Sequence, residues 1–202
     1  MRKKTEARRL QFVMAAGKLF IDHGFASVTM ESVAAQAGSS KVTLYNYFSS
    51  KDALFEAYVI EAGKRLMERL LDAPAKGQTL DDILHHLGMS YLELVTAPDI
   101  VALNRLIIGE VGRFPELARM FYGLGPKKTV SYIGDVMSEL MAKKLIRQAD
   151  VRMLSLHFKV LCEAGIVERT LWGVDPLPTD TLALEASVTT ATQAFIRLYA
   201  NP

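Results

Sequence analysis

The sequence predicts an all-α protein with a three-helix, helix-turn-helix domain in residues 1–50 and a helical bundle in residues 51–202. Half of the 202 residues are hydrophobic and only seven are proline, so the chain can bury a substantial core. Apolar residues recur every three or four positions, and no stretch alternates long enough to require a sheet. Charge is also unevenly distributed. Residues 1–50 hold seven lysines and arginines and three acidic residues, whereas residues 51–202 hold seventeen lysines and arginines and nineteen acidic residues. A basic N-terminal part suits a polyanionic partner.

The first helix is expected over about residues 5–23. The expected apolar face is Leu10, Val13, Met14, Gly17 and Phe20, at three- and four-residue spacing. Gly24 can end this helix, because glycine readily takes the left-handed conformation at that position.

The next two helices are short and joined by a glycine-containing turn. Thr29 is a candidate N-cap for a helix whose apolar face is Met30, Val33, Ala34 and Ala37. Gly38 breaks this helix, and Ser39 or Ser40 can cap the next one. Two short helices with this connection predict a helix-turn-helix.

The third helix, at about residues 40–48, presents a polar face. Leu44 and Phe48 are four residues apart and must point inward. At about 100° per residue, the outward positions are then Val42, Thr43, Tyr45 and Asn46. Lys41, at the tip that enters the major groove, can donate to guanine, and Val42 can pack on a thymine methyl. The hydroxyls of Thr43, Tyr45 and Tyr47 can donate to phosphates. The alternative is that both tyrosines are core aromatics with surface hydroxyls.

The bundle begins with a long helix from the capping-box-like Ser49–Asp52 segment to about residue 71. A loop at residues 72–78 follows, and later helices are expected to start near Thr79, Asp99, Pro115, Pro126, Asp150 and Asp180. The last two, at about 150–172 and 180–199, carry more apolar surface than one inner face needs. They predict a homodimer interface at Leu154, Phe158, Leu161, Gly165, Leu182, Ala186, Thr189 and Phe195. The alternative is that these residues complete the core of one chain.

A ligand pocket is expected among the methionines and aromatics between residues 67 and 158, because such side chains can line an adaptable apolar cavity. The candidates are Met67, Met89, Tyr91, Leu103, Asn104, Phe121, Tyr122 and His157.

Residues 29–55 resemble the DNA-binding domain of TetR-family repressors. The resemblance is carried by Ala-Gly-Ser at 37–39, Thr-Leu-Tyr at 43–45, Tyr-Phe at 47–48 and Ser-Lys-Asp at 50–52. It implies phosphate contacts from Thr29, Tyr45, Tyr47 and Lys51, and base contacts from Lys41, Val42 and Tyr45. Val42 departs from the small residue, often glycine, found there in the family. The full expected DNA-binding set is Thr29, Ser40, Lys41, Val42, Thr43, Tyr45, Tyr47 and Lys51.

Residues 103–106 and 113–122 resemble the C-terminal domain of the AefR-like group of the same family. The family resemblance implies a homodimer that a small effector, often hydrophobic or cationic, releases from its operator. Two heads in such a dimer would read palindromic double-stranded DNA. The single cysteine and the lack of an apolar run of membrane length predict a cytoplasmic protein. A repressor is expected, although activation stays open because the sign depends on the position of the operator.

Three other classes compete with this interpretation. Asp81 and His85, or Asp82 and His86, are spaced as metal ligands, but the neighbouring histidines point about 100° apart, so solvated ion pairs are favoured. Cys162 with His157 resembles a nucleophile pair, yet a buried thiol is commoner. A basic N-terminus, Arg2 to Arg9, could bind a membrane surface, but the turn glycine and the Lys41–Tyr47 face would then have no role. It also resembles the start of a signal peptide, but the uncharged stretch that follows is short and helical periodicity runs through it. We therefore expect no enzymatic activity, cofactor, metal site or membrane partner.

Overall fold

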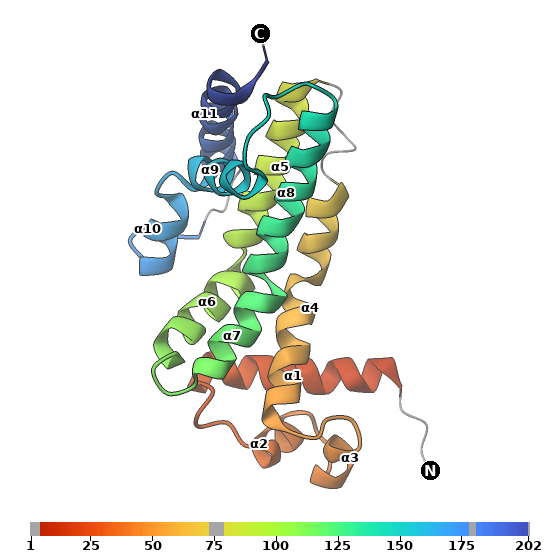
Figure 1. Ribbon diagram of the computed structural model, residues 1–202. Helices are drawn as coiled ribbons and strands as arrows, with labels where there is room; N and C mark the ends of the chain where they lie inside the picture. The colour runs from red at the N-terminus through yellow and green to blue at the C-terminus, as the bar shows by residue number, and fades with distance from the viewer. Residues whose placement is uncertain (1–4, 73–78, 178–180, 202) are drawn as a thin grey trace. The chain divides into compact units, whose positions relative to one another are not determined.

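A computed structural model describes residues 5–72, 79–177 and 181–201, and most of these residues lie in helices (Figure 1). The described residues contain no strand and one isolated antiparallel bridge, between Ile146 and Ala200. The all-α prediction is confirmed. The helices are α1 Glu6–His23, α2 Met30–Gln36, α3 Lys41–Tyr45, α4 Lys51–Asp72, α5 Leu80–Val95, α6 Pro98–Glu110, α7 Pro115–Leu124, α8 Pro126–Ala142, α9 Val151–Glu163, α10 Ile166–Trp172 and α11 Leu182–Tyr199.

The chain forms two compact units, and their division differs from a simple cut after residue 50. Residues 1–62 and 102–125 make the first unit, and residues 63–101 and 126–202 make the second. The boundary therefore falls inside α4, and parts of α6 and all of α7 belong with the N-terminal helices. The division into a helix-turn-helix domain, residues 1–50, and a ligand-binding and dimerisation domain, residues 51–202, stays a prediction.

Aromatic rings form the centre of the first unit. The centre of the Phe25 ring lies 5.4 Å from that of Phe20 and 5.5 Å from that of Phe55. The ring of Phe114, just before α7, packs edge-to-face with Phe25 at a centre-to-centre distance of 5.3 Å. Gly24 has a φ of 80°, which confirms the expected glycine stop after α1. This stop turns the chain so that Phe25 can reach the core.

Helices α1 and α4 approach each other closely at Gly17. A Cβ atom added there would lie 2.2 Å from the Tyr58 ring, which is buried. Only a residue without a side chain leaves room for that ring.

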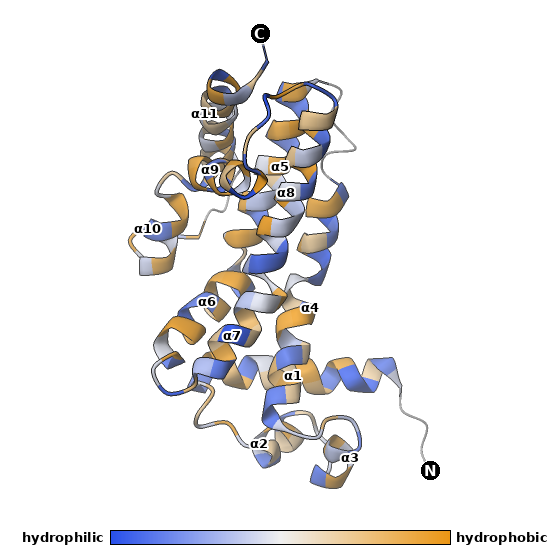
Figure 2. Cartoon of the chain, in the orientation of Figure 1, coloured by the Kyte–Doolittle hydropathy of each residue, from blue (hydrophilic) through white to orange (hydrophobic). Residues whose placement is uncertain are grey.

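The second unit is a bundle in which α9 packs on α8 and α11, and α11 packs on α5 (Figure 1). Its largest fully buried side chains include Tyr91, Phe158 and Phe195. Hydrophobic and hydrophilic residues mix along these helices (Figure 2), as an amphipathic bundle requires. At Gly88 of α5, an added Cβ would lie 2.8 Å from Val188 and 3.2 Å from the Cys162 sulfur, so three helices converge on that glycine.

One expected helix is broken in the structure. The sequence predicted a continuous helix over residues 150–172, but α9 ends at Glu163, and Ala164 and Gly165 take positive φ values of 30° and 87° before α10 begins. Two left-handed residues in succession redirect the chain, so the apolar pattern belongs to two helices.

Most expected helix starts are confirmed by their caps. Thr29, Ser40, Thr79 and Asp150 each accept a hydrogen bond from a first-turn amide, and Pro115 occupies the first turn of α7. The start of α4 differs by one residue, because Ser50 rather than Ser49 accepts from the Ala53 amide, at 3.1 Å. The expected third helix is also shorter, ending at Tyr45. Asp180 and most of the expected 72–78 loop lie outside the described residues.

Within the described ranges, no helix is both long and apolar enough to cross a lipid bilayer.

Candidate nucleic-acid interface

The ends of α2 and α3 are fixed by their own side chains. Thr29 Oγ1 accepts from the Ser32 amide and Ser32 Oγ accepts from the Thr29 amide, both at 3.1 Å, which is a reciprocal capping box. Gly38, with a φ of 57°, makes the turn, and Ser40 Oγ accepts from the Thr43 amide at 3.1 Å. The local sequence therefore determines the geometry of the helix-turn-helix.

The first turns of α1 hold this motif from behind. Gln11 donates to the Ala37 carbonyl at 3.0 Å, and the Arg8 guanidinium donates to the Gly38 carbonyl at 3.5 Å. The Thr5 amide donates to the Tyr47 hydroxyl at 3.0 Å. These three bonds connect the start of α1 to the turn between α2 and α3 and to the residue two positions after α3, so α3 is held from both of its ends.

The side chains that helical periodicity predicts on the outward face of α3 are exposed to solvent. Val42 is 73% exposed and Tyr45 46% exposed, whereas Leu44 is fully buried. Tyr47 is different: its ring packs at 5.4 Å from that of Phe12, and it is partly buried. The core-aromatic alternative therefore describes the Tyr47 ring, and Tyr45 lies on the exposed face.

Lys41 forms an ion pair with Glu31 of α2, and its ammonium lies 5.8 Å from the centre of the Tyr45 ring. The hydrogen bond between the two side chains raises the pKa of Lys41 and lowers that of Glu31. Both side chains remain more than half exposed. Sequence reasoning missed Glu31, although its place in the first turn of α2 was a signal that it lies beside α3.

Lys51 is engaged by the protein itself. Its ammonium donates to the Phe25 carbonyl at 2.7 Å and lies 4.3 Å from the centre of the Phe25 ring. Partial burial lowers the pKa of Lys51, opposed by the nearby carboxylates of Asp52 and Glu110. An ammonium has three N–H donors, so a donor remains for a phosphate in addition to this bond.

The candidate ligand-pocket residues are divided between the two units. Met67, Met89, Tyr91 and His157 lie in the second unit, and Leu103, Asn104, Phe121 and Tyr122 lie in the first. Tyr91 is buried and its hydroxyl donates to Glu163 at 2.6 Å, with the Lys159 ammonium 2.8 Å from the same oxygen. His157 and Tyr122 are exposed, and His157 contacts the Tyr199 hydroxyl.

The candidate dimer residues also separate into two groups. Leu154, Phe158 and Phe195 have no exposed surface, because they fill the core of the second unit in a single chain. Leu182, Ala186, Thr189 and Gly165 are exposed, and Leu161 is partly buried. For the three buried residues, the single-chain alternative is the arrangement observed.

The competing metal and thiol hypotheses concern the Asp81–His86 segment and Cys162. Among the residues that the structure describes, no three His, Cys, Asp or Glu side chains are grouped so that they could hold a metal ion. Cys162 is fully buried, and burial raises the pKa of its thiol to about 12.

Two family models match this chain. Residues 13–58 match the DNA-binding domain of the bacterial regulatory proteins of the tetR family, and residues 82–201 match the C-terminal domain of AefR-like transcriptional repressors. The chain belongs to the TetR family. Members of this family are transcriptional regulators with a helix-turn-helix, a class without enzymatic activity.

Several curated transcriptional regulators of the helix-turn-helix type match over short segments of this chain. An uncharacterized regulator from Mycobacterium tuberculosis is 38% identical over 69 residues, which is 34% of each chain. UidR of Escherichia coli is 30% identical over 77 residues, 38% of this chain and 39% of UidR. The transcriptional activator FasR of Mycolicibacterium smegmatis is 41% identical over 56 residues, 28% of this chain and 26% of FasR. The matched segments thus span about a third of these relatives' lengths.

Solved structures match along the whole chain. A TetR-family regulator from Mesorhizobium loti superposes with a TM-score of 0.85 at 21% identity, covering 98% of this chain and all of that one. The flavonoid-responsive regulator FrrA superposes with a TM-score of 0.82 at 28% identity, covering 97% of this chain and 98% of FrrA.

Proposed function

We propose that this TetR-family member binds a palindromic DNA operator as a homodimer, represses transcription and is released by a small hydrophobic effector. The single observation that carries DNA binding is the exposed α3 face, where Lys41, Val42 and Tyr45 project from a helix whose position α1 secures. Two such helices, placed by a two-fold axis, meet successive major grooves about 34 Å apart.

Each proposed contact has a chemical role. Lys41 leaves Glu31 and donates to guanine, and the Val42 side chain packs on a thymine methyl. Thr29, Ser40, Thr43 and the hydroxyls of Tyr45 and Tyr47 face phosphate oxygens together with Lys51. The phosphate contacts set the register, and the base contacts set the sequence.

The dimer is proposed on the exposed apolar residues of the second unit. Trp172 is 78% exposed, Leu182 74%, Val174 63% and Val160 61%, and such residues are costly to leave in water. Trp172 is the only tryptophan in the chain, so its emission reports the interface. Dilution of the protein should shift that emission to longer wavelength, and Leu182→Glu should give a monomer in light scattering. Dimeric Leu182→Glu protein would place the interface elsewhere.

Selection from random duplex DNA tests the binding proposal. We expect a palindromic consensus, with affinity falling steeply as salt rises. Lys41→Ala should change the preferred bases. Lys143→Ala should not, although Lys143 is also an exposed lysine, paired with Glu139 at 2.6 Å on α8. No enrichment at low salt would contradict the proposal.

Repression is supported by the match to the AefR-like repressor domain, and a hydrophobic effector by the likeness to flavonoid-responsive FrrA. In transcription in vitro from a promoter that overlaps the consensus, the protein should lower transcript yield, and a flavonoid such as quercetin should restore it. Methionine-to-alanine changes at Met67 and Met89 should weaken the release without weakening DNA binding. A rise in transcript on adding the protein would indicate an activator.

A further inference from the structure

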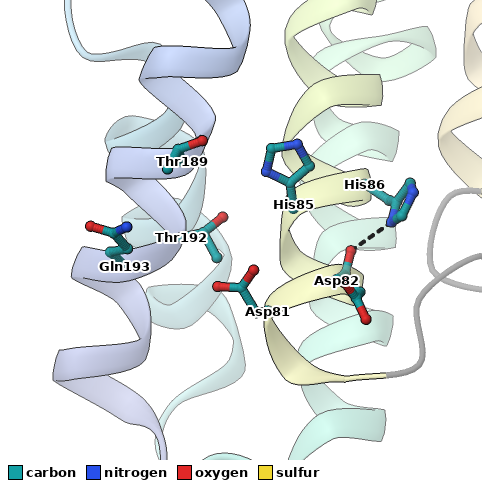
Figure 3. Close-up of a pocket in the computed structure, with 7 residues that line it drawn as sticks. All are labelled: Asp81, Asp82, His85, His86, Thr189, Thr192 and Gln193. Carbon is teal, nitrogen blue, oxygen red and sulfur yellow. Dashed lines mark hydrogen bonds between the residues drawn. The ribbon is translucent and has the colours of Figure 1, made fainter.

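A polar cavity lies between α5 and α11 of the second unit (Figure 3), and none of its lining residues belongs to the proposed DNA-binding set or to the proposed effector residues. It has a volume of about 340 Å³, within the range of sites that hold small molecules. Seven polar residues line it: Asp81, Asp82, His85, His86, Thr189, Thr192 and Gln193.

One lining group is buried and unsatisfied. Thr192 is 1% exposed, and its hydroxyl oxygen has no hydrogen-bond partner among the described residues. Thr190, two residues earlier on α11, instead donates to the Ala186 carbonyl one turn back, at 2.9 Å. A buried hydroxyl without a partner is costly, so an occupant that pairs with Thr192 would bind favourably.

The charge of the lining selects the kind of occupant. It contains two carboxylates and no lysine or arginine, and Glu185 lies 4.0 Å from His85 at its edge. Asp82 is already engaged, because its carboxylate accepts from the Thr79 amide at 3.1 Å as the helix cap. No hydrogen bond or ion pair joins the Asp81 carboxylate to another described side chain, and Figure 3 places it on the side of α5 that faces α11.

We propose that this cavity binds the ammonium group of a small primary amine. Asp81 accepts one N–H from α5, and the hydroxyls of Thr192 and Thr189 accept the others from α11. Asp81 supplies the charge, and Thr192 gains the partner that it lacks. A divalent cation suits the cavity less well, because the described carboxylates and histidines do not group as metal ligands.

Binding at this site is independent of DNA and of the proposed hydrophobic effector. The occupant bridges two helices that are packed directly on each other, so it stabilises the second unit by mass action. An open cavity and a four-atom ligand limit the affinity, and a Kd on the order of 1 mM is expected.

The test is a titration of the full-length, isotope-labelled protein followed by the amide resonances of residues 81–86 and 189–193. Ethanolammonium is the probe, ethylene glycol is its neutral counterpart, and tetramethylammonium carries the charge without N–H donors. We expect saturable shifts with ethanolammonium, and at least about tenfold weaker binding of both other probes, because each lacks the charge or the donors. Equal binding of either control probe, or no saturable shift with ethanolammonium, would overturn the proposal.

Two variants assign the ammonium to these side chains. Asp81→Asn removes the charge and Thr192→Val removes the hydroxyl with little change in volume, and each should weaken ethanolammonium binding by about tenfold. Asp135→Asn, an exposed carboxylate on α8, should leave the Kd unchanged. Unchanged binding in Asp81→Asn and Thr192→Val would also overturn the proposal. Since no DNA is present, failure here leaves the proposed DNA-binding function untouched.

Discussion

Replacing Gly17 by alanine should destabilise the first unit although alanine is the better helix former. The added Cβ would lie 2.2 Å from the Tyr58 ring, and ordinary contact begins at 3.4 Å. Helix α1 or the buried ring must therefore move by about 1.2 Å or more. Overpacking of this kind costs about 1–3 kcal/mol, and the helix propensity of alanine returns about 1 kcal/mol.

The net loss should be up to about 2 kcal/mol, or up to about 8 °C in Tm for a chain of this length. Thermal unfolding by circular dichroism at one fixed protein concentration measures it, and the fixed concentration removes any effect of dimerisation.

Gly63→Ala is the matched control. Gly63 is also inside a helix, α4, but nothing lies within 4 Å of its added Cβ, so this change should raise Tm by about 2–4 °C. If Gly17→Ala also raised Tm, the close approach of α1 and α4 would not limit residue 17, and the reasoning would be wrong.

Three further changes give separate tests. Glu31→Gln removes the intramolecular partner of Lys41, so the affinity for every duplex should rise, and the slope of log affinity against log salt should steepen by about one. Fluorescence anisotropy with consensus and scrambled DNA measures both quantities, and an unchanged slope would contradict this prediction. Gly38→Ala meets no atom within 4 Å but must hold a φ of 57°, so it should cost about 1 kcal/mol in urea unfolding, and a neutral result would argue against that conformation. Cys162 is buried and the pKa of its thiol is raised to about 12, so it should react with a thiol reagent at pH 8 only as fast as the protein opens. In urea the thiol should react at once, and rapid labelling of the native protein would refute its burial.

Elements defined by local chemistry could be predicted from the sequence. Gly24, Thr29 and Ser40 act through their own backbone or the next turn, so their roles follow from neighbouring residues. The inward positions of Leu44 and Phe48 followed from helical spacing, and Val42 is exposed for the same reason.

Features that depend on distant residues could not be predicted. The Lys51 ammonium meets the Phe25 carbonyl only after α4 has docked on the α1–α2 connection. Ala164 takes a left-handed conformation that its own chemistry disfavours, so the break after α9 left only Gly165 as a local signal. The spacing of Asp81 and His85 could be tested only as a pair of metal ligands. Thr192, whose unpaired hydroxyl lines the same cavity, lies over a hundred positions away on α11.

The membership of residues 102–125 in the first unit has a consequence for engineering. Chimaeric regulators can be built by joining the N-terminal head of one family member, which carries the helix-turn-helix, to the C-terminal bundle of another. A junction after residue 50 would separate Phe25 from its native partner Phe114, and the Ala26 amide from the Glu110 carboxylate that accepts from it at 3.4 Å. A transplant that carries residues 102–125 along with the head keeps both contacts, so hybrid proteins should be designed with three crossovers rather than one.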